Sequence, residues 1–506
     1  MHHDRLNPKV SVSIVFVAAM FMSIMDGTIV NVALPSIGRQ LGIPSVSLDA
    51  VVVAYLVSLA MVIPASGWLG DRWGTRRIFL LALALFTVTS ALCGLAGNFT
   101  LLVLFRFLQG AAGGALAPLG TAMLYRTFPP AQRVQISSVL IIPTVIAPGT
   151  GPILGGLLVE QLSWRWVFFV NVPIGIAAFL FGLLFLQEHR EPAAGRFDLP
   201  GFLLAGIGLA LALYALSEGP TRGWSSPVVL GSALAGLLLL SAFVVIELRV
   251  REPMVDLRLL GDRLFRTANL VSLFSSGGFL GILFVGPLFL QEGLGVTPLT
   301  SGLTTFPEAL GVVTSTQIVA WLYPRVGPRR LMVAGLTVVA VVMALMSLLG
   351  RDTNLWFMRL LMFLTGAGMA YAFVPGQTAA FATISSAAMG QASALSNALR
   401  QLGSALGVAV IGGVLSLVGL TSLSTTGTAQ PNLMAYHSAF LAAAALALIA
   451  ACIALGISDR DAAPTMGPQA RQVAHETTQG QPSLMEAGSS SGVRRETRES
   501  GGRSYG

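Results

Sequence analysis

The chain has 506 residues, of which 54% are hydrophobic and only 10% are charged. Soluble domains carry about 25% charged residues, so this composition excludes a water-soluble globular protein and indicates an all-α polytopic membrane protein. The formal net charge of +8 could suggest a nucleic-acid partner. The basic residues lie mostly between the apolar runs, however, so we assign them to membrane topology and expect no nucleic-acid partner.

Fourteen apolar runs along the chain are each long enough to cross a hydrocarbon core of about 30 Å. They lie at about residues 10–34, 47–69, 78–97, 99–123, 134–158, 166–186, 199–218, 227–248, 267–291, 300–322, 331–350, 355–380, 391–416 and 436–457. With the N-terminus inside, most arginines fall on the cytoplasmic side, which is the positive-inside pattern. We therefore expect a multi-pass protein of the inner (cytoplasmic) membrane with both termini in the cytoplasm.

The first run is predicted to be a retained membrane span that carries Asp26 and Asn31. A charged carboxylate at membrane depth costs about 2.5–3.5 kcal/mol on insertion scales, so Asp26 should face a cavity, be paired, or be protonated. We interpret Asp26 as a proton-coupling residue and place Asn31 on the substrate pathway. The alternative is that Asp26 is a structural residue, hydrogen-bonded to a neighbouring helix.

The segment between the second and third runs is predicted to be a gating loop. Its residues are Gly67, Gly70, Asp71, Arg72, Gly74, Arg76 and Arg77. The glycines permit a sharp turn, and the carboxylate of Asp71 can pair with a helix N-terminus or with a facing arginine. Such a charged latch can break and re-form, although the arginines alone would also serve as a positive-inside anchor.

Two arginines occupy equivalent depths in the fourth and twelfth runs. Arg106 and Arg359 lie roughly eight residues inside their runs, about 12 Å deep at 1.5 Å per residue. We expect Arg106 to take part in proton coupling and Arg359 to lie on the substrate pathway. Snorkelling of their guanidinium groups to the outer surface is the alternative.

The fifth run concentrates helix-bending and small residues in one short stretch. They are Pro148, Gly151, Pro152, Gly155 and Gly156. This composition predicts a kinked, smooth-faced helix that packs tightly and can bend.

The tenth run carries the second intramembrane carboxylate, Glu308. On a helix Thr304, Glu308, Gly311 and Ser315 lie within about 60° of one another, which predicts a polar stripe that faces the interior. Pro307 should interrupt the helix here. We expect Glu308 to take part in proton coupling, and Thr304 and Ser315 to line the pathway; helix packing is the alternative.

The thirteenth run has a second polar stripe. Ser393, Asn397, Arg400 and Ser404 fall on one helix face, and Gly403 and Gly407 allow a close neighbour. This face either lines the substrate pathway or hydrogen-bonds two helices together.

An internal repeat divides the chain into two related halves. The segment that begins with Trp68 and contains several arginines recurs 253 residues later, beginning with Trp321. Arg359 follows Arg106 by the same interval. Two related halves of a membrane protein usually enclose a central substrate path. Two acids do not recur, because Phe279 and Pro324 stand at the positions equivalent to Asp26 and Asp71.

This repeat sets the expected domain organisation. The six-helix halves are residues 1–190 and 267–457, residues 191–266 form a linker with two extra membrane helices, and residues 458–506 form a disordered cytoplasmic tail. Cys93 and Cys452 are far apart in apolar runs and suggest neither a disulfide nor a metal site. We also expect no cofactor, because no phosphate-binding Gly-rich loop is present.

Several of these motifs resemble those of one transporter family. Residues 26–35 look like the first-span signature of its 14-helix drug:proton antiporters, and residues 67–77 resemble the superfamily's loop between helices 2 and 3. The fourth-helix motif at 106–110, the fifth-helix antiport motif at 151–156, and the segments 164–173 and 400–403 also match. Over about residues 10–457 the chain therefore resembles the major facilitator superfamily, in its branch of multidrug and quaternary-ammonium exporters.

The chain also departs from this family's pattern at three positions. Ala147 stands where the fifth-helix motif usually begins with glycine. Ala320 and Pro324 replace glycine and aspartate in the second-half loop. The resemblance therefore makes Asp71, in the first half, the expected gate.

The resemblance implies a proton-coupled exporter of hydrophobic, cationic drugs or antibiotics that works by alternating access and is not an enzyme. Its expected partners are a small-molecule substrate, protons and the lipid bilayer, and we expect a monomer. Two alternatives stay open: an exporter dedicated to a single metabolite or self-made antibiotic, and a lipid-handling or sensory membrane protein without antiport.

Overall fold

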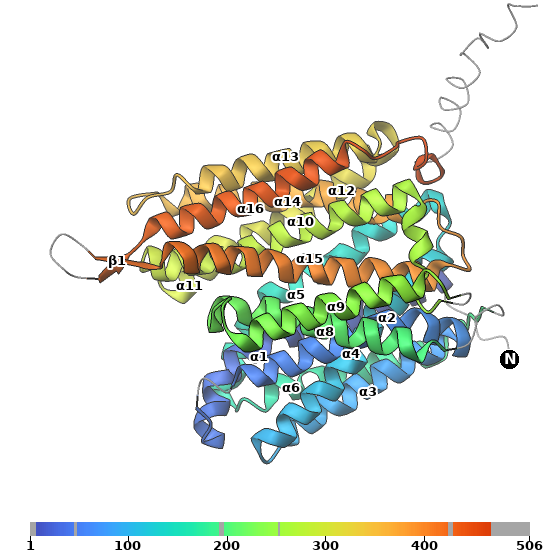
Figure 1. Cartoon of the computed structure of the whole chain (residues 1–506), viewed down its shortest axis with the longest axis horizontal. Coiled ribbons are helices and arrows are strands. Elements are labelled where there is room, and N and C mark those ends of the chain that lie inside the picture. The colour runs from blue at the N-terminus through green and yellow to red at the C-terminus, as the bar shows by residue number, and fades with distance from the viewer. Residues whose placement is uncertain (1–6, 45–47, 192–196, 251–252, 424–428, 467–506) are drawn as a thin grey trace, which may run out of the picture.

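The computed structural model describes residues 7–44, 48–191, 197–250, 253–423 and 429–466. Within these residues the secondary structure is helical apart from one short β-hairpin (Figure 1). The helices of the first half are α1 (Pro8–Leu41), α2 (Asp49–Trp73), α3 (Thr75–Leu95), α4 (Phe99–Thr127), α5 (Arg133–Gln161), α6 (Trp166–Phe169) and α7 (Asn171–Phe185). Of the tail predicted at residues 458–506, residues 458–466 are described and include a 3₁₀ turn at Ala463–Thr465, and the part from residue 467 onward lies outside the described residues.

The linker and the second half continue the same pattern. The linker forms a helical hairpin of α8 (Leu199–Arg222) and α9 (Pro227–Glu247). The second half contains α10 (Arg263–Leu288), α11 (Pro298–Thr305), α12 (Pro307–Val326), α13 (Pro328–Met346), α14 (Leu355–Ala380), α15 (Met389–Val418) and α16 (Leu433–Ala454). Short elements complete it: the 3₁₀ turns η2 (Pro130–Gln132), η3 (Leu257–Gly261) and η5 (Ala463–Thr465), the π-turn η4 (Phe289–Gly293), and the antiparallel strands β1 (Thr421–Leu423) and β2 (Ala429–Pro431).

Twelve helices in the described part of the chain are long and apolar enough to cross a membrane. The two other predicted spans correspond to α5 and to the pair α11 and α12. The second of these is broken after Thr305, and Pro307 begins the new helix as predicted. Proline fits there because the first turn of a helix leaves its N–H groups without an intrahelical acceptor.

The first two helices end later than predicted. The first span was expected to end at residue 34, but α1 continues through Pro35 to Leu41, where Gly42 takes a left-handed φ of 66°. The second was expected to end at residue 69, but α2 continues to Trp73 and breaks at Gly74, whose φ is 106°. In both cases the helix ends at the glycine whose φ is positive, a conformation that costs other residues more.

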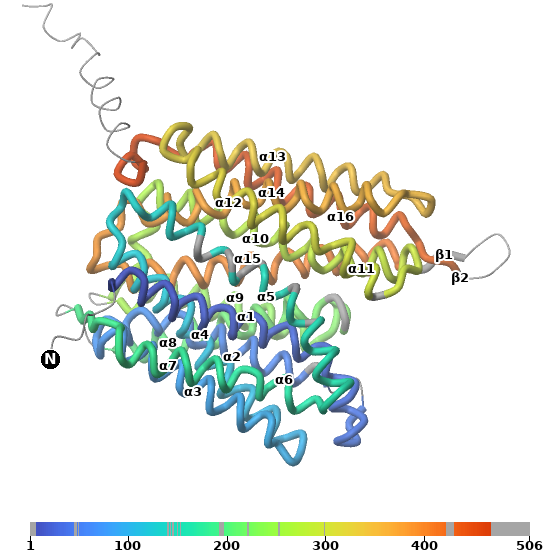
Figure 2. The backbone as a smooth tube through the Cα atoms, turned by 180° about the vertical axis from the view of Figure 1, so that it is seen from behind, coloured from blue at the N-terminus to red at the C-terminus, as the bar shows by residue number. Residues whose placement is uncertain are grey.

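The helices form two layers with the linker hairpin beside them. In Figure 2, seen from behind, α1 to α4, α6 and α7 lie in one layer and α10 to α16 in the other, and α5 runs between them. The contacts agree, because α5 packs against α1 and also against α12 and α14. The linker helix α8 packs on α2 and α15. The division of the chain into two halves and a linker at residues 190 and 267 stays a prediction.

The described side-chain hydrogen bonds between the two halves gather at one end of the bundle, which we call the arginine-rich end (Arg72, Arg76, Arg77, Arg126 and Arg133). Here Thr378 donates to Ser137 at 2.9 Å. Arg133 and Arg126 donate to the main-chain oxygens of Phe381 and Ser386. The ring of Tyr125 also stacks on that of Phe381, with centroids 4.5 Å apart. The halves are therefore joined at this end.

A pair of carboxylates secures the linker hairpin near the same end. Glu247, only 1% exposed, accepts a hydrogen bond from the main chain of Val255 at 2.6 Å, and Asp198 caps α8 at Gly201. The second oxygen of each carboxylate is buried without a hydrogen-bond donor among the described residues, and both lie against Gly201. Two unpartnered acceptor oxygens side by side are costly unless a proton lies between them.

Glu247→Gln should therefore keep or raise the thermal stability of the protein. The new amide can donate to Asp198 while its oxygen still accepts from Val255. Glu247→Ala, which leaves the Val255 N–H without an acceptor, should cost about 1–3 kcal/mol. Thermal unfolding of the detergent-purified variants at pH 7 and pH 9 tests this; a large loss with the glutamine variant would show that no proton is shared.

Candidate functional site

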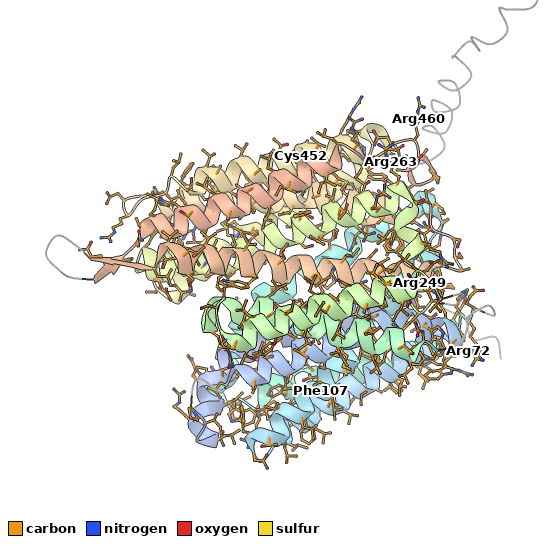
Figure 3. All side chains as sticks on the ribbon, in the orientation of Figure 1. Arg72, Phe107, Arg249, Arg263, Cys452 and Arg460 are labelled. Carbon is orange, nitrogen blue, oxygen red and sulfur yellow. The ribbon has the colours of Figure 1, made fainter. Side chains whose placement is uncertain are left out.

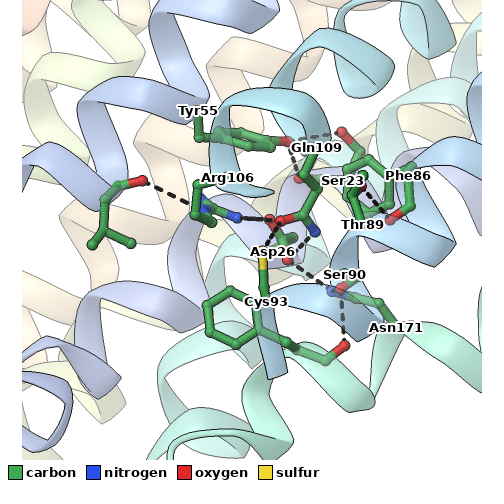
Figure 4. Close-up of polar contacts among 12 residues, drawn as sticks. Ser23, Asp26, Tyr55, Phe86, Thr89, Ser90, Cys93, Arg106, Gln109 and Asn171 are labelled. Atoms are coloured by element: carbon green, nitrogen blue, oxygen red, sulfur yellow. Dashed lines mark hydrogen bonds and ion pairs between the residues drawn. The ribbon is translucent and has the colours of Figure 1, made fainter. Parts of the chain in front are cut away.

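A buried ion pair lies at the centre of the first half. Arg106 of α4 donates to Asp26 of α1 at 2.5 Å, and the exposed fractions of the two side chains are 1% and 0% (Figure 4). The sequence did not predict that these two residues form a pair. The alternative in which Arg106 snorkels to the outer surface is wrong for this residue, because its guanidinium turns inward to the carboxylate.

Two amides complete the coordination of the Asp26 carboxylate. Gln109, one turn after Arg106 on α4, donates to it at 3.0 Å, and Asn171 at the start of α7 donates at 2.8 Å. Asn171 also donates to Ser90 of α3 at 3.1 Å. Asp26 thus accepts from donors on two helices, and α3 is joined to the cluster through Asn171 (Figure 4). Three donors therefore converge on this one carboxylate.

The guanidinium of Arg106 has further partners that hold it in place. It donates to the side-chain oxygen of Gln109 at 2.9 Å and to the main-chain oxygen of Val51 at 3.3 Å. Its carbon lies 4.2 Å from the ring centroid of Tyr55, a cation–π contact. Tyr55 in turn donates to the main chain of Ser23 on α1 at 3.2 Å. Arg106 therefore joins α1, α2 and α4.

The predicted gating loop is a helix end rather than a long loop. Of the three glycines in this segment, only Gly74 has a positive φ. Gly67 and Gly70 lie inside α2, and their expected role in the turn was wrong. They permit close packing instead, because a Cβ at Gly67 would meet the main chain of Gly390 and one at Gly70 would meet Leu119.

Asp71, in the last turn of α2, lies where the two halves meet. Arg126 of α4 pairs with it at 2.7 Å and also donates to the main-chain oxygen of Ser386 in the second half at 3.0 Å. A Cβ at Gly390 would touch the Asp71 carboxylate, so this acid lies at the N-terminus of α15. Both partners considered from the sequence, an arginine and a helix N-terminus, are present.

The other arginines of this segment contact the end of α7. Arg76 donates through its main chain to Glu188 at 3.1 Å, and Arg77 lies 3.5 Å from the same carboxylate. Arg72 is a neighbour of Asp71 at the exposed surface of this end (Figure 3). The contacts of Arg76 and Arg77 join the start of α3 to Glu188, just after α7, so they lie within the first half.

Among the described residues of the second half, no ion pair corresponds to that of Asp26 and Arg106. Phe279, at the position equivalent to Asp26, packs edge-on against Phe373. Arg359 is the fifth residue of α14, whereas Arg106 is the eighth of α4. Arg359 stacks on Trp356 at 4.4 Å. The expected equivalence in depth was wrong, because α14 begins later than the repeat predicts.

The polar stripe on the tenth span is buried between helices. Glu308, 3% exposed, has one side-chain oxygen without a partner among the described residues. A Cβ at Gly366 would meet the main chain of Glu308, and one at Gly311 would meet Phe363. The stripe therefore packs on α14. Its other members, Thr304 and Ser315, are also buried.

The stripe on α15 forms a chain of hydrogen bonds along its own helix. Asn397 donates to the main chain of Ser393 at 2.9 Å and accepts from Arg400 at 3.0 Å. No carboxylate pairs with Arg400 among the described residues. Gly403 and Gly407 contact the main chain of α10, as their spacing predicted. Ser404 is half-buried.

The glycines of α5 allow it to approach α1. A Cβ at Gly151 would meet Thr28, and one at Gly155 would meet Ile29, whereas the space beside Gly156 is open. The helix runs without interruption through this stretch, where Pro148 is half-buried. The side chain of Pro152 lies outside the described part. Asn31, on α1, is exposed and belongs to no described cluster.

Sequence reasoning missed Gln109, Asn171 and Tyr55 as members of the site. Amides and tyrosines in apolar runs give no charge signal, so their role depends on which helices meet. Gln109 carried a usable signal, since it lies three residues after Arg106 and hence on the same helix face. Asn171 lies on α7, and its approach to Asp26 could not be read from spacing.

Comparison with known proteins agrees with this architecture. The family model described as Major Facilitator Superfamily matches residues 16–408 and 268–487. The putative multidrug resistance protein MdtD of Salmonella heidelberg is 33% identical over 421 residues, covering 82% of this chain and 88% of that protein. A multidrug resistance protein B homolog of Mycobacterium tuberculosis is 33% identical over 402 residues, covering 78% and 74%.

Solved structures show the same fold at lower identity. The human organic anion transporter MFSD10 superposes with a TM-score of 0.61 at 18% identity, covering 88% of this chain and 99% of that one. The proton:xylose symporter XylE gives a TM-score of 0.61 at 14% identity, covering 88% and 94%.

Proposed function

The chain belongs to the major facilitator superfamily and is an integral membrane transporter; from this premise we propose that it exports hydrophobic, cationic drugs or antibiotics in exchange for protons. The observation that carries the proposal is the buried pair of Asp26 and Arg106, a protonatable group whose charge holds several helices together. The names of the multidrug-resistance relatives support the substrate class.

The proposed orientation places the arginine-rich end in the cytoplasm. Arginines next to membrane spans are retained on that side by the positive-inside rule. The contacts that join the two halves then close the cytoplasmic side, and the structure corresponds to the outward-facing state. In this state the carboxylate of Asp26 takes up a proton from outside.

In the proposed coupling step a proton from outside binds the carboxylate of Asp26 and cancels its charge. Arg106 then loses its counter-ion and keeps Gln109 and the ring of Tyr55 as partners, so the tie between α1 and α4 weakens. Release of the proton to the cytoplasm restores the pair. Exchange of one proton for one monovalent cation moves no net charge, so the pH difference drives export at about 1.4 kcal/mol per pH unit, and no nucleotide is needed.

The gate in this scheme is the contact of Asp71 with Arg126 and the start of α15. When the halves rock, α2 and α15 must separate at this point. The carboxylate is stabilised there by the guanidinium and by the partial positive charge of the helix N-terminus. The latch therefore favours the outward-facing state until proton binding at Asp26 offsets it.

Transport in proteoliposomes tests the proposal as a whole. Purified protein is reconstituted with an imposed pH gradient, and a cationic dye such as ethidium is added on the side of the arginine-rich end. Antiport predicts substrate-dependent proton movement that stops when the gradient is collapsed. If no drug of a broad panel causes proton movement, the result would instead support a dedicated exporter or a membrane protein without antiport.

Glu308 is the proposed contact for the charge of the substrate. Its carboxylate oxygen has no donor among the described residues, so a cation would be its counter-ion. Glu308→Gln should lower transport of a monovalent cationic dye roughly tenfold, the value of one lost charge-assisted contact. Transport of a neutral drug should change little.

A matched control for that experiment is Glu160→Gln, which removes an exposed acid at the end of α5. It should leave the transport of both compounds near the wild-type rate. If Glu308→Gln reduces the neutral and cationic substrates equally, Glu308 acts in proton coupling or packing rather than in charge recognition.

A further inference from the structure

A pocket of about 360 Å³ lies at the arginine-rich end of the second half, far from Asp26 in the chain. It is formed by the start of α10, the start of α13 and the residues that follow α16. Its charged lining residues are Arg263, Arg329, Arg460 and Asp459. The volume is at the lower end of the range of ligand pockets, roughly 300–1,000 Å³.

The three guanidinium groups of this pocket are available to bind a ligand. Among the described residues none of them has a hydrogen-bond or ion-pair partner, although Asp459 lies in the same pocket. Asp459 instead accepts from the main-chain N–H of Arg329 at 3.0 Å and so caps α13. One acid against three arginines leaves a surplus of two positive charges, which suits a phosphate group.

The helix N-termini are not the binding groups here. Asp262 caps α10 by accepting from Phe265 at 2.8 Å, and Asp459 caps α13 in the same way. An anion in the pocket would therefore be held by side chains. Arginine suits phosphate because its planar donors can bind two oxygens at once.

An apolar stripe leads from the bilayer to the pocket. On α16 the exposed residues recur every three or four positions: Leu441, Ala445, Leu448, Cys452 and Leu455. Leu455 itself lines the pocket. Figure 3 shows Cys452 on α16, with Arg263 and Arg460 beyond it at the end of the bundle. The stripe spans about 21 Å at 1.5 Å per residue, more than one leaflet of hydrocarbon.

We propose that this pocket binds the phosphate headgroup of an anionic phospholipid, whose acyl chain lies along the exposed face of α16. A free phosphate shares the headgroup chemistry, but it would make no use of the apolar stripe. The inference uses the orientation proposed above and does not depend on proton coupling or on the exported substrate.

The chain offers a natural probe for this site. Cys452 is exposed and Cys93 is buried, so a thiol-reactive fluorophore should label Cys452 alone in the full-length protein. The labelled protein is placed in nanodiscs of phosphatidylcholine that contain an equal fraction of brominated phosphatidylglycerol or brominated phosphatidylcholine. Enrichment of the anionic lipid at the pocket predicts stronger quenching by brominated phosphatidylglycerol.

A charge-matched pair of variants tests the arginines. The variant R263Q/R329Q/R460Q should weaken the phosphatidylglycerol preference roughly tenfold or more, since each arginine near a membrane surface contributes about one factor of five. The control R190Q/R249Q/R330Q removes the same charge from exposed arginines outside the pocket and should retain the preference. Equal loss in both variants would overturn the proposal.

Inorganic phosphate distinguishes the two sources of the ligand. At millimolar concentration it should not abolish the quenching difference in wild-type nanodiscs. If phosphate removes the difference, or stabilises the detergent-purified protein as well as phosphatidylglycerol does, the pocket is a site for a soluble phosphate. Equal quenching by the two brominated lipids in the wild type would overturn the lipid proposal without any variant.

Discussion

Asp26→Asn is expected to abolish proton-driven export, lowering the rate at least roughly 100-fold, as expected when an essential proton-transfer group is removed. Asparagine keeps the size of the side chain but cannot take up and release the proton. It also leaves Arg106 as an uncompensated buried cation, and breaking a buried pair in this way costs about 3–5 kcal/mol. Loss of activity alone would therefore not separate coupling from misfolding.

The double variant Asp26→Asn/Arg106→Gln makes that separation. Removing both charges avoids the unpaired cation, so thermal stability should recover by most of the loss seen in either single variant, whereas proton-driven export should stay absent. Such non-additivity is expected of residues in direct contact. Stability is measured by thermal unfolding in detergent and export by dye accumulation in proteoliposomes. If the double variant exports with a proton gradient, Asp26 is structural.

The sequence carried enough information for the fold and for the two charged residues of the site. Long apolar runs predict membrane helices because backbone groups in lipid must bond within their own segment. Asp26 and Arg106 stand out because ionised groups are costly at membrane depth. The break at Pro307 was predicted from the missing N–H of proline.

What the sequence did not reveal depends on contacts between helices. The donors Gln109 and Asn171 lie in segments that match family motifs, but the motifs do not say what these amides contact, and only the packing of α4 and α7 on α1 brings them to Asp26. Gly67 was interpreted as a turn residue because glycine serves turns and close packing equally well. Its position against Gly390 needs the second half to be in place. The predicted equal depth of Arg106 and Arg359 was wrong for another reason. A repeat gives the spacing between two residues in the sequence but not the residue at which each helix begins.

Asp71→Asn is the second variant expected to have a large effect, with export reduced roughly tenfold. The change removes the charge that both Arg126 and the N-terminus of α15 stabilise, contributions of about 1.5–3 and 0.3–1 kcal/mol. The outward-facing state should lose population. Double electron–electron resonance between spin labels at the arginine-rich ends of the two halves should then report longer distances, with Glu188→Gln as a control that affects only contacts within the first half.

Reversing the ion pair distinguishes the two partners of Asp71. In Asp71→Arg/Arg126→Asp the opposite charges are restored, but an arginine now faces the N-terminus of α15 beside Gly390 and is repelled by its partial positive charge. We therefore expect the reversed pair to recover less than half of the lost export and to keep the longer distances. Full recovery would show that the ion pair alone forms the latch and that the helix N-terminus contributes nothing. The outcome decides between two ways of holding the second half. One is the Asp71–Arg126 pair, which reaches the second half through the hydrogen bond of Arg126 to the main chain of Ser386. The other is the contact of Asp71 with the N-terminus of α15.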